Sequence, residues 1–293
     1  MEFAEMKSRA ERMRSRDLYG VVSKEELDSL PVTQTELYVP TDAGEVHVYE
    51  IHPLTELAPN SPMIINFHGG GFIKGRQDKD LLFCGRLASE LHVLVWDVDY
   101  RLAPEYPYPT AKDESYAVCK WAGEHASELG IDPSKIALLG HSAGGNLAIT
   151  VCMKAGETGA FKPAALMAEY CPLDLATDPA TKPRAEGDMP AEVAKTYNAF
   201  YCDPETAKDP YVSPLFATKK QLKAFPETMM LYAENDSLSF EDAEFAAKLS
   251  LAGVKVTSKC FPDSLHGFTL CRNGRWEESM AMILDFLEEK LNG

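Results

Sequence analysis

The chain has 293 residues, of which 45% are hydrophobic and 25% charged, and its formal net charge is −16 at pH 7. Such an acidic chain lacks the surplus of lysine and arginine that nucleic acids and anionic membrane surfaces require, so we expect neither as a partner. No apolar run approaches the roughly 18 residues of a membrane-spanning helix, and the start, Met-Glu-Phe-Ala-Glu-Met, is not that of a signal peptide. The seven cysteines contain no C-x-x-C pair, which indicates neither a disulfide framework nor a zinc site. We therefore expect a cytoplasmic protein that holds no metal.

The first elements in the chain are a helical segment and a hairpin. Residues 1–30 mix apolar and charged side chains at helical spacing, and two short extended runs follow, Gln34–Val39 and Glu45–Ile51. The Thr-Asp-Ala-Gly between these runs is typical of a tight turn, so we predict a β-hairpin.

Beyond Pro62, short continuous apolar runs alternate with longer amphipathic ones. Continuous apolarity is expected of strands that are covered on both faces. The predicted strands are Met63–Phe67, Val93–Val98, Ile136–Gly140, Ala165–Tyr170, Met229–Ala233 and Val254–Phe261. The predicted helices lie near 79–91, 112–128, 143–155, 240–252 and 276–291.

This alternation predicts an α/β fold, with a mostly parallel sheet of about eight strands between layers of helices. One interval breaks the alternation, because residues 172–227 are rich in Pro, Asp, Thr and Lys and contain no convincing strand. An insertion at this place predicts a cap over the carboxyl ends of the strands, where open α/β sheets bind ligands.

A serine in a glycine-rich turn is the central chemical feature of the sequence. The run is Gly140-His141-Ser142-Ala143-Gly144-Gly145, after a strand pattern and before a helical one. A serine on so sharp a turn adopts strained backbone angles, and glycines two positions away on either side let the chain pack tightly. Its hydroxyl then stands at a helix N-terminus, where the helix dipole favours negative charge. We predict that Ser142 is a nucleophile; the alternative is an incidental turn.

A second glycine-rich loop, His68-Gly69-Gly70-Gly71-Phe72, follows the first strand of the parallel part. Three consecutive glycines suit a loop whose N–H groups point at one atom. With the N–H of Ala143, those of Gly70 and Gly71 would form an oxyanion hole. A phosphate-binding loop would have Lys and Ser or Thr after the glycines, whereas Phe-Ile follows here.

A serine nucleophile needs a base, and the base needs a carboxylate that orients it. Of the seven histidines, only His266 follows the serine where the chain order Ser, Asp or Glu, His requires one. For the acid we favour Asp236, which lies just past a predicted strand. Glu234 and Asp263 are the rivals.

These segments, together with Asp99–Glu105 and Asp209–Pro214, resemble the hormone-sensitive-lipase-like branch of the α/β-hydrolases, from about residue 34 to the end. The resemblance implies an α/β-hydrolase fold in a single domain, 1–293, with a helical cap from about 1–30 and about 174–215. It also implies the roles of individual residues: catalytic Ser142, Asp236 and His266, and oxyanion-hole donors Gly70, Gly71 and Ala143.

Two positions depart from the pattern of that family. His141 stands where Asp usually precedes the nucleophile, and Phe240 stands where an Asp often follows the acid by four residues. A histidine before the nucleophile is also similar to arylformamidases and acetyl-sugar esterases, so the substrate class stays open. We expect His141 to pack behind the turn rather than to act in catalysis.

The expected function is that of a carboxylesterase that hydrolyses small, short-chain esters through an acyl-enzyme, without a cofactor. An amidase or arylformamidase, an acetyl-sugar esterase and a small-molecule receptor on a hydrolase scaffold are the alternatives. The expected partner is a small-molecule ester, and the resemblance suggests a homodimer. Tyr197, Phe200 and Tyr201 either line the substrate pocket or hold the cap to the core.

Overall fold

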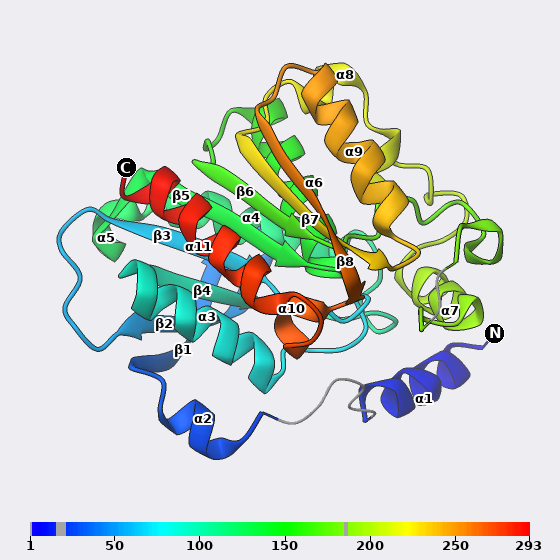
Figure 1. Cartoon of the computed structure of the whole chain (residues 1–293), viewed down its shortest axis with the longest axis horizontal. Coiled ribbons are helices and arrows are strands. Elements are labelled where there is room, and N and C mark those ends of the chain that lie inside the picture. The colour runs from blue at the N-terminus through cyan, green and yellow to red at the C-terminus, as the bar shows by residue number, and fades with distance from the viewer. Residues whose placement is uncertain (1, 16–21, 185–186) are drawn as a thin grey trace.

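One eight-stranded sheet forms the centre of the part of the chain that the computed structural model describes, residues 2–15, 22–184 and 187–293 (Figure 1). The order of its strands is β1-β2-β4-β3-β5-β6-β7-β8. All pairs from β4 to β8 are parallel, and β2 joins β4 antiparallel. The strands are β1 (Val32–Thr41), β2 (Gly44–Pro53), β3 (Ser61–Phe67), β4 (Leu94–Asp99), β5 (Ile131–His141), β6 (Ala165–Glu169), β7 (Glu227–Asn235) and β8 (Val256–Leu265). The α/β-hydrolase fold and the mostly parallel sheet are therefore confirmed.

Helices cover both faces of this sheet. On one face lie α3 (Asp78–Leu91) and α11 (Trp276–Leu291), which are in front in Figure 1. On the other lie α4 (Thr110–Glu124), α6 (Ala143–Thr158) and α9 (Ser239–Leu251). Successive residues of β3 point to opposite faces, so Ile64 packs with the first layer and Ile65 with the second, both fully buried. This double burial explains the continuous apolar runs.

The hairpin and the helices differ from their predicted limits in a few places. β1 and β2 pair from Val32 to Pro53, so the hairpin is longer than predicted. The predicted helix 112–128 is split at His125 into α4 and α5 (Ala126–Leu129). The backbone of His125 leaves the helical region at φ −108°, and its Nδ1 lies 3.0 Å from the carbonyl oxygen of Trp121. The side chain thus competes with the continuing helix.

The strand limits differ by a few residues at the carboxyl ends. β6 ends at Glu169 because Tyr170, predicted as its last residue, has φ +40°. β8 begins at Val256 rather than at residue 254 and continues past Phe261 to Leu265. The changed carboxyl ends of β6 and β8 lie next to loops that carry site residues, Tyr170 and His266.

The two segments outside the sheet pattern lie side by side in Figure 1. Helix α1 (Phe3–Arg14) packs on α7 (Ala191–Tyr201), where Ala10 and Phe200 share a buried cluster with Ile73. The predicted helical segment 1–30 also contains α2 (Lys24–Asp28), and its residues 16–21 lie outside the described ones. Between β6 and β7 the described residues form no strand but only short helices: η1 (Pro179–Thr181), α7, η2 (Pro214–Phe216) and α8 (Lys219–Leu222).

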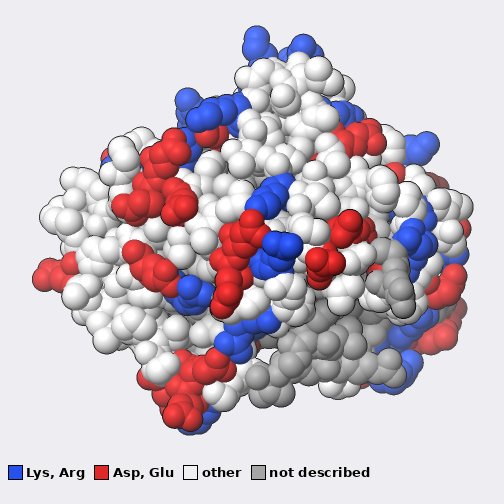
Figure 2. Space-filling view, in the orientation of Figure 1, with Lys and Arg blue, Asp and Glu red and all other residues white. Residues whose placement is uncertain are grey.

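Charge and cysteines follow the pattern of an ordinary folded domain. On the face that Figure 2 shows, acidic and basic side chains are interspersed rather than gathered by sign. All seven cysteines lie within the described ranges, five of them are buried, and none forms a disulfide bond. Among the described helices, none combines the length and the apolar character needed to cross a bilayer.

Candidate active site

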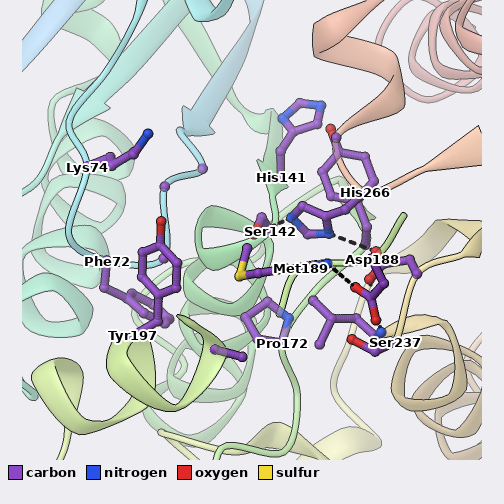
Figure 3. Close-up of a pocket in the computed structure, with 18 of the residues that line it drawn as sticks. Phe72, Lys74, His141, Ser142, Pro172, Asp188, Met189, Tyr197, Ser237 and His266 are labelled. Atoms are coloured by element: carbon purple, nitrogen blue, oxygen red, sulfur yellow. Dashed lines mark hydrogen bonds and ion pairs between the residues drawn. The ribbon is translucent and has the colours of Figure 1, made fainter. Parts of the chain in front are cut away.

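Ser142 lies between the end of β5 and the start of α6, on a turn that only glycines permit. Its backbone angles are φ 54° and ψ −122°, in a strained region for a residue with a side chain. A Cβ on Gly144 would collide with the Phe67 carbonyl oxygen, and one on Gly140 with the Gly144 carbonyl oxygen. The tight turn leaves the Ser142 hydroxyl at the N-terminus of α6, facing a cavity (Figure 3).

His266 and Asp236 complete a chain of hydrogen bonds that ends at Ser142. The Nε2 atom of His266 lies 3.1 Å from Ser142 Oγ, and its Nδ1 lies 2.7 Å from Asp236 Oδ2. The other oxygen of Asp236 accepts a hydrogen bond from the Leu238 N–H at 3.0 Å, and the residue is 2% exposed. The structure thus brings Ser142, His266 and Asp236 together, although they are far apart in sequence.

The two rival carboxylates do not reach the histidine. Glu234 and Asp263 are both exposed. The Glu234 side chain accepts a hydrogen bond from the backbone N–H of Asp263 at 3.2 Å. Their contact closes the loop beside β8, and of the three candidates only Asp236 contacts His266.

The electrostatic surroundings favour a protonated His266. Burial alone would lower the pKa of its imidazole, but the charge of Asp236 and its hydrogen bond outweigh burial, and Asp188 adds to them. The pKa of His266 is therefore raised above its ordinary value. A histidine in this setting accepts a proton readily, and its imidazolium form is stabilised next to Ser142.

The glycine loop after β3 lies against the same cavity. Gly70 has φ +126° and Gly71 has φ +62°, and a Cβ on Gly70 would come within 2.6 Å of the Lys74 carbonyl oxygen. Among the described residues, no acceptor binds the backbone N–H of Gly70, Gly71 or Ala143. Gly70 and Gly71 line the cavity that Ser142 faces, and Ala143 follows Ser142 directly in the chain.

The cavity walls carry more charge than the sequence pattern indicated. The segment between β6 and the end of α7 forms much of the wall. The loop that leads into α3 forms a further part of it. The charged residues in the lining, besides Asp236 and His266, are Lys74, Lys79, Asp80, Asp174, Lys182 and Asp188. Their spacing in the sequence has no regular pattern, so sequence reasoning did not find them.

Aromatic residues near the cavity divide into lining and packing groups. Tyr197 lines the cavity, whereas Phe200 and Tyr201 are buried, and Tyr201 stacks on Phe72 with ring centroids 3.6 Å apart. Tyr170, which sequence reasoning missed, lies edge-on to His266 at 4.9 Å between ring centroids. Its place directly after β6 was the available signal, because strand ends carry the other site residues.

The two positions that depart from the family pattern have different surroundings. His141 is 1% exposed and packs against the edge of Phe83, and Figure 3 shows its ring turned away from Ser142. Phe240 is 62% exposed. The two acids after it are buried instead: Glu241 accepts hydrogen bonds from the backbone of the chain after β6 and from Lys182, and Asp242 accepts from the Cys171 N–H.

The part of the chain that the structure describes contains no candidate metal centre. Within those ranges, no group of three or more His, Cys, Asp or Glu side chains could hold a metal ion. The contacts of Ser142 and His266 support the chemistry of a serine activated by a histidine, next to N–H groups that could bind an oxyanion.

The chain is similar in sequence and in fold to known carboxylic-ester hydrolases. The carboxylesterase NlhH of Mycobacterium tuberculosis is 33% identical over 214 residues, covering 71% of this chain and 67% of the relative. The ethyl acetate hydrolase of Pseudomonas putida is 30% identical over 236 residues, covering 78% of this chain and 73% of the relative. Carboxyl esterase 2 of the fungus Tuber melanosporum superposes with a TM-score of 0.83 at 26% identity, over 98% of each chain.

A family model described as the alpha/beta hydrolase fold matches residues 64–270, a range that contains Ser142, Asp236 and His266. The match agrees with the resemblance to the hormone-sensitive-lipase-like esterases and lipases. The chain belongs to the α/β-hydrolase-fold family.

Proposed function

We propose that this chain is a carboxylesterase that hydrolyses small esters with short acyl chains, with Ser142 as nucleophile, His266 as base and Asp236 as the acid that orients the base. The observation that carries the proposal is the continuous pair of contacts from Asp236 Oδ2 to His266 Nδ1, at 2.7 Å, and from His266 Nε2 to Ser142 Oγ, at 3.1 Å. Carboxylic-ester hydrolysis is also the activity in the names of the relatives.

The reaction follows from the placement of these atoms. His266 Nε2 takes the Ser142 proton while Oγ attacks the ester carbonyl carbon, and the tetrahedral oxyanion accepts hydrogen bonds from the N–H groups of Gly70, Gly71 and Ala143. The intermediate collapses to an acyl-enzyme, and the leaving alcohol takes the proton from His266. A water molecule then gives a proton to His266 and attacks the carbonyl carbon of the acyl-enzyme. The second intermediate breaks down to the free acid, and His266 returns the proton to Ser142.

Asp236 acts through the histidine rather than on the substrate. Its carboxylate accepts the Nδ1–H of His266, so the neutral imidazole keeps its lone pair on Nε2, toward Ser142. When the imidazole takes the serine proton, the same carboxylate stabilises the positive charge. The raised pKa of His266 is consistent with this role.

A cap on a single domain, residues 1–293, forms the outer wall of the site in this proposal. The cap consists of about 1–30, which includes α1, and of about 174–215. The residues that support it are Asp174, Lys182, Asp188 and Tyr197, which line the cavity opposite Ser142. Arg14 at the end of α1 binds Glu105 at 2.6 Å, which fixes the N-terminal part of the cap to the body.

The proposal includes a preference for short acyl groups. Lys74 is 6% exposed, Asp80 is 2% exposed, and both line the cavity. The name of the Pseudomonas putida relative points to the same class, since ethyl acetate is a short ester.

Hydrolysis of p-nitrophenyl esters from acetate to palmitate, by the protein and by its Ser142→Ala variant, tests the proposal. We expect rates that peak at acetate or butyrate and vanish in the variant. Matched aryl formamides and acetylated sugars run beside the esters. Activity confined to an amide, or a folded protein inactive on every ester, would contradict the proposal and favour an amidase or a ligand receptor.

A further inference from the structure

Glu169 is a buried carboxylate at the end of β6 that the proposed reaction does not use. It is 0% exposed and pairs in the sheet with His141, the residue before the nucleophile. Its carbonyl oxygen accepts a hydrogen bond from the Ser142 N–H at 2.9 Å. The backbone of Glu169 therefore directly supports the turn that carries Ser142.

The side chain of Glu169 reaches the segment that follows the catalytic histidine. Its Oε1 accepts hydrogen bonds from Thr269 Oγ1 at 2.8 Å and from Ser279 Oγ at 2.7 Å. The two hydroxyl oxygens lie 2.9 Å from each other, and the two residues are 4% and 0% exposed. Thr269 lies in the short helix α10 (Phe268–Cys271), three residues after His266, and Ser279 lies in α11.

The second carboxylate oxygen of Glu169 faces His141. Its Oε2 lies 3.0 Å from His141 Nε2, without the alignment of a hydrogen bond, and neither atom has a hydrogen-bond partner among the described residues. Burying a carboxylate is costly unless several groups stabilise it. Here the stabilising groups come from three elements, β5, α10 and α11, that surround the site.

The loop that carries His266 is held by the pairing of Leu265 with Asn235, by the buried Phe268 and by the hydrogen bond of Thr269. Gly267 has φ +78°, and α10 is a single turn of four residues. Thr269 is the member of that turn whose side chain bonds to the sheet. A shift of about 1 Å in a catalytic group can lower the rate about 100-fold, so the position of this turn bears directly on the contact between His266 and Ser142.

We propose that Glu169 is a positioning residue that, through Thr269 and Ser279, holds the His266 loop in register with the Ser142 turn. This inference rests on the proposed function, since it assigns a role in the activity of His266. Glu169 touches neither substrate nor reacting atoms. One side chain thereby joins the two loops whose 3.1 Å contact starts the reaction.

The test uses Thr269→Val, which removes one hydroxyl and keeps the shape of the side chain. Thr150→Val is the matched control, because Thr150 is also buried and its hydroxyl donates to Leu147 O within α6 alone. Thr269→Ser restores the hydroxyl. For each variant, kcat and KM on p-nitrophenyl acetate, the rate of inactivation by diethyl p-nitrophenyl phosphate, and Tm are measured.

We expect Thr269→Val to lower kcat and the inactivation rate about 10- to 100-fold, with KM changed less than about two-fold. Thr269→Ser should recover most of the loss, and Thr150→Val should keep kcat within about two-fold even if Tm falls equally. Wild-type kcat in Thr269→Val, or an equal loss in Thr150→Val, would overturn the inference. Failure of the proposed function has a different result: the wild type is inactive on esters, or the Ser142→Ala variant is active.

Discussion

Replacing Asp236 by Asn changes the charge and one hydrogen-bonding group at the centre of the site while keeping the side-chain shape. In the structure, Oδ1 accepts the Leu238 N–H at 3.0 Å and Oδ2 faces His266 Nδ1 at 2.7 Å. The amide oxygen of Asn must stay toward the Leu238 N–H, so its NH₂ group faces Nδ1. His266 then carries its proton on Nε2, which can no longer accept the proton of Ser142.

This reversed tautomer sets the size of the effect. The same substitution in a serine-protease triad lowers kcat about 10⁴-fold, which corresponds to roughly 5.5 kcal/mol of transition-state stabilisation. We expect kcat for p-nitrophenyl acetate to fall by a factor of that order. The rate is measured from the release of p-nitrophenolate. Far-UV circular dichroism and Tm establish that the variant is folded.

Asp174→Asn is the matched control for this substitution. Asp174 lines the same cavity, and its Oδ1 accepts the N–H groups of Ala176 and Thr177, which an amide oxygen can also do. We expect its kcat to stay within a few-fold of the wild type. A folded Asp236→Asn variant that keeps more than a tenth of wild-type kcat would refute the tautomer argument.

Two further substitutions test the charges around the cavity. Asp188 helps to raise the pKa of His266, so the base stays protonated and inactive up to a higher pH. Asp188→Asn should therefore move the acidic limb of the kcat/KM profile to lower pH. An unmoved limb would contradict the influence of Asp188 on this pKa. Lys182 Nζ lies 2.5 Å from Glu241 Oε1, with side chains 11% and 7% exposed. Lys182→Met should therefore lower the free energy of unfolding by about 3–5 kcal/mol, against less than about 1 kcal/mol for Lys195→Met, whose side chain is 37% exposed. Equal losses in urea unfolding would contradict the importance of the buried pair.

The sheet could be predicted because burial on both faces gives its strands continuous runs of apolar residues. Ile64 and Ile65 face opposite layers and are both fully buried, so the strand is continuously apolar. Since β5, β6, β7 and β8 are parallel and lie in this order in one half of the sheet, their carboxyl ends lie at one edge. The closeness of Ser142, Asp236 and His266 follows from that topology once the three strands are identified.

The rest of the site depends on contacts between residues that no local pattern connects. Glu169 and Thr269 are 100 positions apart, and Lys182 and Glu241 are 59 apart. Each partner by itself has the appearance of an ordinary surface residue in the sequence. The break at His125 was missed for a similar reason, since periodicity carries no information on a side chain that bonds its own helix.

Whether Ser142 is the nucleophile can be decided by locating the covalent adduct formed with diethyl p-nitrophenyl phosphate. The inhibited protein is digested, and the modified peptide is sequenced by mass spectrometry. The account predicts one diethyl phosphate group per chain, on Ser142, with loss of esterase activity in proportion to labelling and no labelling of Ser142→Ala. Inhibition with the adduct on another residue, or ester hydrolysis that persists in Ser142→Ala, would contradict it.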